Sequence, residues 1–217
     1  MRPRGSGLRP ILSLAALVAV SGAIALLIVG CSASSRATSG HAGASLELHA
    51  AGLLSPPSSA PALALRNYLG QPVNIDSYRG RAVLVTFIYT HCPDVCPLIT
   101  SNLRVAQNLM GPGGSAKVQI IAVSVDPRGD TSKTVAAFLA RRGMTGRMQY
   151  LIGSASQLAR VWSAWGVGSL RDVRNPELVE HSGLVYGITG SGKRVSIYAA
   201  DFRPADIAHD VPLLAAG

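Results

Sequence analysis

Two cysteines four residues apart carry the clearest chemistry in this sequence. Cys92 and Cys96 stand in the stretch Cys-Pro-Asp-Val-Cys-Pro, directly after the apolar run 82–89. Thiolates bind soft metal ions and also form disulfides, so the pair predicts one of these two uses. A disulfide across so short a loop stabilises a fold little through chain entropy. The spacing therefore favours chemistry over a structural cross-link.

The residues around the pair predict a strand-to-helix junction. The continuous apolar run 82–89 is typical of a strand that is buried on both faces. Pro97 suits the first turn of a helix, which we expect to continue to about residue 108, with Asp94 as its cap. Because helix N-termini stabilise negative charge, we expect this placement to lower the pKa of both thiols.

From residue 62 onward, strand and helix signals alternate. We expect a hairpin of two short strands around residues 70–72, an irregular loop over 166–180, and a cap for the second helix at Asp130 or Thr131. The other predicted strands are 117–125, 149–152, 181–188 and 194–199, and the other predicted helices are 131–142, 154–165 and one from about 204. This order predicts an α/β fold, a thioredoxin-like central sheet with flanking helices and an N-terminal β-hairpin extension.

The first 31 residues read as a targeting segment. Arg2, Arg4 and Arg9 precede the uncharged apolar stretch 11–29, which is just long enough to span a bilayer. The residues Ile-Val-Gly before Cys31 resemble a bacterial lipobox, so Cys31 is a candidate lipidation site. A lipoprotein and an uncleaved membrane anchor both remain open. Either one places the domain on the extracytoplasmic side of the cell membrane.

Residues 32–61 are rich in Ser, Ala, Gly and Pro and predict a flexible linker, followed by a single domain over 62–217. The linker histidines His41 and His49 are interpreted as solvated side chains, and so is His209 in the last helix. Beyond the first Arg residues the chain has 17 Lys and Arg against 11 Asp and Glu, scattered along the sequence. This pattern does not predict nucleic-acid binding.

Four segments together resemble the Sco/SenC family of copper-binding cytochrome c oxidase assembly proteins. They are 87–97 around the cysteines, 123–131, 153–167, and 180–186 around His181. The resemblance runs from about residue 62 to the C-terminus. It implies one copper ion per chain, bound by Cys92, Cys96 and His181, and a role in assembling the binuclear copper site of cytochrome c oxidase subunit II.

The chemistry of these three side chains agrees with that implication. Two thiolates and one imidazole form a soft set that suits Cu(I), and a further ligand or water would complete Cu(II). Structural zinc sites usually use four protein ligands, which makes zinc the weaker alternative. Asp126 follows a predicted strand and is a candidate to hold the site by an outer hydrogen bond. His91 is expected to point away from the metal.

Two functions remain. The first is a membrane-anchored copper chaperone, not an enzyme, which receives copper from a donor protein and passes it to subunit II. The second is a thiol-disulfide oxidoreductase that keeps the oxidase cysteines reduced, with Cys92 and Cys96 as its redox pair and an external thiol reductant. Redox proteins of this fold mostly use Cys-x-x-Cys, so the extra residue here favours the chaperone.

Overall fold

The computed structural model describes residues 47–50, 52–171, 179–181 and 183–217. The predicted targeting segment, Cys31 and His41 lie outside these residues. In the described part of the chain, no helix combines the length and the apolar character needed to cross a membrane.

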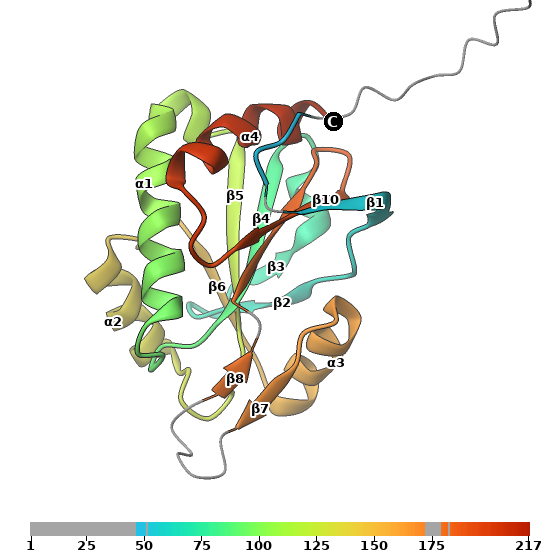
Figure 1. The fold of residues 1–217 in the computed structure, drawn as a ribbon. Helices are drawn as coiled ribbons and strands as arrows, with labels where there is room; N and C mark the ends of the chain where they lie inside the picture. The colour runs from blue at the N-terminus through green and yellow to red at the C-terminus, as the bar shows by residue number, and fades with distance from the viewer. Residues whose placement is uncertain (1–46, 51, 172–178, 182) are drawn as a thin grey trace, which may run out of the picture. The chain divides into compact units, whose positions relative to one another are not determined.

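A mixed sheet of eight strands forms the centre of the described domain, in the order β1-β10-β9-β4-β5-β6-β2-β3 (Figure 1). Its strands are β1 (Gly52–Ser59), β2 (Ala64–Asn67), β3 (Pro72–Asn74), β4 (Ala82–Ile88), β5 (Val118–Ser124), β6 (Gln149–Ile152), β9 (Leu184–Ile188) and β10 (Lys193–Ala199). Two short strands, β7 (Ser169–Arg171) and β8 (Val179–His181), pair separately. The helices are η1 (Ile75–Tyr78), α1 (Val95–Ser115), α2 (Ser132–Arg142), α3 (Ala155–Trp165) and α4 (Pro204–Ala216).

Strand β4 lies in the middle of this sheet and leads to the cysteines. Every one of its residues is buried, as its apolar sequence predicts. It runs parallel to β5, with Ala82 opposite Val118, and antiparallel to β9. The expected hairpin is present as β2 and β3, which join the sheet through β6. The prediction of a thioredoxin-like α/β fold is thus confirmed.

The helices begin and end close to the predicted residues because their signals are local. Thr131 caps α2 by accepting a hydrogen bond from the backbone N–H of Thr134, and Gly143 ends the helix with φ 65°. Asp130 is therefore not the cap. Helix α1 extends to Ser115, past the predicted end, with a break at Gly111 where φ is 64°. Helices α1 and α4 lie side by side (Figure 1).

Three of the described strands lie where the sequence predicts irregular chain. Strand β1 falls within the predicted linker 32–61 and pairs with β10, so the folded part begins before residue 62. Strands β7 and β8 occupy both ends of the predicted loop 166–180. They lie beyond the end of the sheet at which α1 begins (Figure 1).

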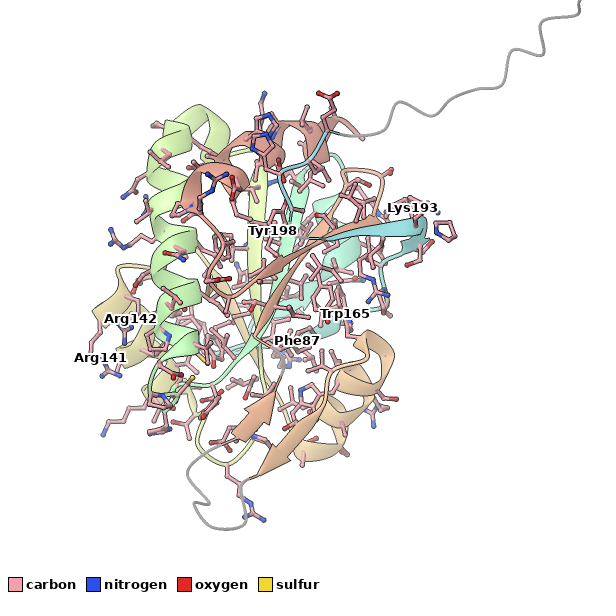
Figure 2. All side chains as sticks on the ribbon, in the orientation of Figure 1. Phe87, Arg141, Arg142, Trp165, Lys193 and Tyr198 are labelled. Atoms are coloured by element: carbon pink, nitrogen blue, oxygen red, sulfur yellow. The ribbon has the colours of Figure 1, made fainter. Side chains whose placement is uncertain are left out.

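An aromatic cluster fixes α3 against the sheet. The ring centroid of Trp165 lies 5.8 Å from that of Phe87, and both residues are labelled in Figure 2. It lies 5.6 Å from the ring centroid of Tyr186. Each of these side chains is buried. The cluster holds the carboxyl half of β4, and with it the start of the cysteine loop, in a rigid position.

Candidate metal centre

The two cysteines lie in the turn between β4 and α1 and in the first turn of α1. Asp94 caps the helix, since its carboxylate accepts a hydrogen bond from the backbone N–H of Val95 at 2.5 Å. This confirms its predicted role. The backbone N–H of Cys96 donates to Cys92 Sγ at 3.3 Å. Cys92 is 7% exposed and Cys96 0%, so the loop covers both sulfurs.

Burial dominates the acidity of Cys96. It raises the pKa of this thiol well above its usual range, and the neighbouring Cys92 raises it further, while a hydrogen bond with the Tyr89 backbone lowers it. The expectation of a lowered pKa is therefore wrong for Cys96, because loss of solvent outweighs the helix terminus. At neutral pH the Cys96 thiol of the metal-free protein keeps its proton.

The buried carboxylate of Asp130 fixes the backbone at the start of the cysteine loop. Asp130 Oδ1 accepts a hydrogen bond from the backbone N–H of Thr90 at 2.9 Å. Its Oδ2 accepts from the Tyr150 hydroxyl at 2.8 Å and from the Ser124 hydroxyl at 2.7 Å. Burial raises the pKa of Asp130, and these three donors lower it in part. Asp130 thus positions the backbone two residues before Cys92.

Sequence reasoning missed this role, although a signal for it existed. Asp130 follows β5, and Cys92 follows β4. Because β4 and β5 are parallel neighbours, their carboxyl ends meet at one edge of the sheet. A carboxylate in the second loop is therefore well placed to bind the first.

Asp126, which is predicted to hold the metal site by an outer hydrogen bond, is buried in the loop that also carries Asp130. Its Oδ1 accepts a hydrogen bond from the backbone N–H of Arg128 at 3.2 Å. A Cβ atom on Gly129 would overlap the Asp126 carboxylate and lie 3.1 Å from His91 Nδ1, so both side chains surround this glycine. His91 itself is exposed. A link from Asp126 to a metal ligand stays a prediction.

The main chain of His181 lies on strand β8, opposite Ser169 on β7. Two residues earlier, the backbone N–H of Val179 donates to the Tyr89 hydroxyl at 3.3 Å. The same hydroxyl interacts with the side chain of Cys92. Burial is the main cause that raises the pKa of Tyr89. Tyr89 therefore connects the strand of His181 to the cysteine loop.

Gly183, two residues after His181 and beyond the end of β8, passes near the start of α1. A Cβ atom on Gly183 would lie 3.5 Å from Val95 Cγ1 and 3.8 Å from Ile99 Cδ1. These residues flank Cys96 on the helix. The chain is thus hydrogen-bonded to the cysteine loop before His181 and passes near the first turn of α1 after it.

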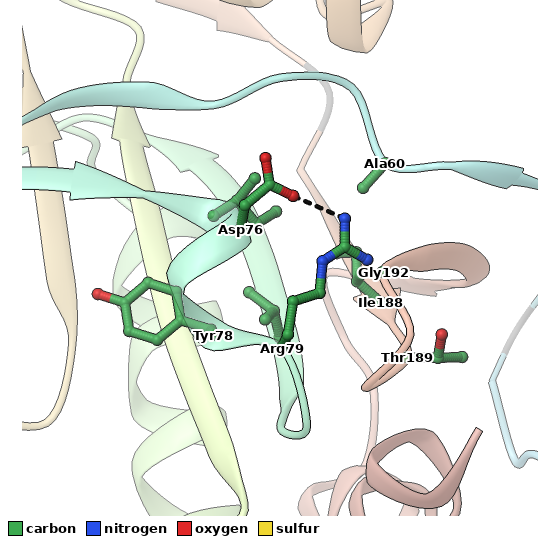
Figure 3. A pocket seen from close by; sticks show the side chains of 9 residues that line it. Ala60, Asp76, Tyr78, Arg79, Ile188, Thr189 and Gly192 are labelled. Carbon is green, nitrogen blue, oxygen red and sulfur yellow. Dashed lines mark hydrogen bonds and ion pairs between the residues drawn. The ribbon is translucent and has the colours of Figure 1, made fainter.

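A small pocket at the amino end of β4 has a different character (Figure 3). It is lined among others by Asp76, Tyr78, Thr189 and Arg79. The guanidinium of Arg79 pairs with Asp76 Oδ1 at 2.6 Å. The pocket includes no cysteine or histidine among its lining residues. It is therefore separate from the cysteine site.

Comparison with protein families matches residues 56–216 to the family described as SCO1/SenC. The chain belongs to the SCO1/SenC family. A curated relative, the mitochondrial SCO2 homolog of Bos taurus, is 32% identical over 126 residues, which cover 56% of this chain and 47% of the relative. The chain spans about half the length of the first curated relatives it matches.

Solved SCO1/SenC structures have the same fold. A SCO1/SenC family lipoprotein from Bacillus anthracis str. Ames matches with a TM-score of 0.64 and 24% identity, covering 75% of this chain and 99% of that one. Bradyrhizobium japonicum ScoI with copper bound matches with a TM-score of 0.59 and 27% identity, covering 72% of this chain and 99% of that one.

Proposed function

We propose that this SCO1/SenC protein binds one copper ion through Cys92, Cys96 and His181 and delivers it during cytochrome c oxidase assembly. The observation that carries the proposal is the hydrogen bond to the Tyr89 hydroxyl from the backbone N–H of Val179, on the strand of His181. The same hydroxyl also interacts with the side chain of Cys92. Membership of the family and the copper named with B. japonicum ScoI support the choice of metal.

The donor set decides which form of copper is held. Two sulfurs and one imidazole nitrogen are soft ligands and suit Cu(I). Cys92 and Cys96 come from one turn, whereas His181 comes from a separate strand. A ligand on its own strand can join or leave the metal without disturbing the two sulfurs. We propose that this arrangement serves transfer to the binuclear copper site of subunit II by stepwise ligand exchange.

The location follows from the N-terminal sequence. We propose that Cys31, or the apolar stretch before it, anchors the protein in the cell membrane with the domain outside the cytoplasm. The B. anthracis relative is named a lipoprotein, which supports the lipid-anchored form. Mass measurement of the N-terminal peptide from membranes distinguishes a lipidated Cys31 from an uncleaved chain.

X-ray absorption on the copper-loaded full chain tests the ligand set. We expect two sulfur ligands and one nitrogen ligand in wild type, and loss of the nitrogen in His181→Ala. His91→Ala is the matched control, because this exposed histidine adjoins Cys92 but is not an expected ligand. A spectrum unchanged by His181→Ala would overturn the three-ligand proposal.

Thiol-disulfide exchange is the alternative use of the same cysteines. The raised pKa of Cys96 argues against it as the attacking group, because the thiolate is the nucleophile. Rapid disulfide turnover by copper-free protein, abolished by Cys92→Ser, would instead establish the oxidoreductase.

A further inference from the structure

Two histidines from distant parts of the sequence stack on one another at the surface of the domain. The ring centroids of His49 and His209 lie 3.7 Å apart, and the ring planes differ by 2°. His49 lies in the segment before β1, and His209 lies on α4. The sequence predicts that both side chains are solvated, and the structure confirms that both are exposed. It shows in addition that they form one cluster.

The buried carboxylate of Asp210 contacts both histidine residues. Asp210 Oδ1 accepts a hydrogen bond from the backbone N–H of His49 at 2.9 Å and lies 2.8 Å from His209 Nδ1. Asp210 Oδ2 accepts from the hydroxyl of Tyr198 at 2.8 Å; Figure 2 labels this residue on β10. Asp210 is 0% exposed. Its carboxylate is therefore held in place while one oxygen faces the imidazoles.

We propose that His49, His209 and Asp210 form a second metal site, which binds a divalent ion of borderline softness such as Zn²⁺ or Cu²⁺. One potential ligand atom from each residue lies within 4.8 Å of the other two. Two imidazoles and a carboxylate form a nitrogen and oxygen set that these ions favour. Without sulfur, the set discriminates against Cu(I), in contrast to the cysteine site.

Metal binding requires one local rearrangement. A metal lies in the plane of each imidazole that binds it, so two parallel rings cannot both bind one ion while they remain stacked. The side chains of His49 and His209 are 50% and 43% exposed, so either ring can turn into solvent. The fixed carboxylate is the buried part of the site and does not need to move.

The charges around the cluster favour a cation. Asp206 Oδ1 lies 3.7 Å from His49 Nδ1 and adds a second carboxylate beside Asp210. Arg203 donates to both Asp206 oxygens, at 2.7 and 3.1 Å, and offsets that charge, so the buried Asp210 supplies the net negative charge. A divalent ion would add positive charge next to the buried Asp210 and join the segment before β1 to α4.

The test measures metal binding in a chain from which the cysteine site has been removed. In the full chain, solubilised in detergent and carrying Cys92→Ser and Cys96→Ser, we expect calorimetry to detect one Zn²⁺ per chain. Adding His49→Ala or His209→Ala should each weaken Zn²⁺ binding at least about tenfold. His91→Ala should leave it unchanged. Electron paramagnetic resonance with Cu²⁺ should detect two bound nitrogens, and one in each single variant.

Both substituted rings are about half exposed, and His49→Ala keeps the backbone N–H that donates to Asp210. A metal-dependent site predicts that Zn²⁺ raises the thermal midpoint of the parent chain but not of the two variants. Absence of Zn²⁺ binding, or binding that either variant leaves unaltered, would overturn the proposal and reduce the cluster to a packing contact. The chain under test lacks both cysteines, so failure here and failure of the copper proposal are distinguishable.

Discussion

Asp130 Oδ1 accepts a hydrogen bond from the backbone N–H of Thr90 at 2.9 Å, two residues before Cys92. This contact crosses from the loop after β5 to the loop after β4. It makes the path of the cysteine loop depend on a carboxylate that is not itself a proposed ligand.

Substitution of Asp130 should therefore affect stability and copper binding together. Asp130→Ala leaves the Thr90 N–H without its acceptor and should lower the free energy of unfolding by about 2 kcal/mol. Asp130→Asn should cost less, because its amide oxygen still accepts from Thr90 and the Tyr150 hydroxyl can donate to Ile88 O, 3.2 Å away. Denaturant unfolding and copper titration measure the two effects. Equal losses in both variants would contradict this account.

Copper binding should release protons. Burial raises the pKa of Cys96, so its thiol is protonated in the metal-free protein at neutral pH, and a metal must displace that proton. The apparent Cu(I) affinity should accordingly rise as pH rises, by about tenfold per pH unit for each proton released. Anaerobic competition with a chromophoric chelator between pH 6 and 8 measures the slope. A flat profile would mean that Cys96 binds no metal or is already ionised.

Tyr89→Phe should loosen the strand that carries His181. The change removes the hydroxyl that accepts from the buried Val179 N–H, at a cost of about 1–2 kcal/mol. We expect faster amide hydrogen exchange at Val179 and weaker copper binding. Tyr78→Phe, on η1, is the control and should alter neither. If copper binding weakened while amide exchange at Val179 stayed unchanged, Tyr89 would act on copper binding only through its contact with Cys92.

The turn between β9 and β10 should not tolerate a side chain at Gly190. A Cβ atom there would lie 2.6 Å from the backbone oxygen of Ala215, so either the turn or the end of α4 must shift. Gly190→Ala should lower the free energy of unfolding by about 1–3 kcal/mol. Gly113→Ala is the control, since a Cβ there meets nothing within 4 Å. A thermal midpoint equal to that of wild type would show that this contact relaxes freely.

The parts of the fold that the sequence predicts are those with local causes. A few neighbouring residues are enough to recognise the buried strand β4, the N-cap Asp94 and Gly143, which ends α2. Strand β1 does not, because its Ser and Pro residues are typical of a linker and it becomes a strand only by pairing with β10.

The same division applies to the site. Cys92 and Cys96 are evident from their spacing, and the resemblance to known sequences points to His181. Asp130 and Tyr89 contribute through tertiary contacts with Thr90 and Val179, which no local pattern records. The raised pKa of Cys96 is equally absent from the local pattern, because a position at a helix start does not reveal how deeply the thiol is buried.

The unequal exposure of the two cysteines would impose an order of events on the proposed exchange with a partner. Cys92 retains a small solvent-accessible surface, whereas Cys96 has none. An incoming thiolate, or a copper ion carried by a donor, would therefore meet Cys92 first and reach Cys96 only from within the site. Release of the proposed copper ion along the same path would free Cys96 first, so Cys92 would be the last sulfur to give up the metal.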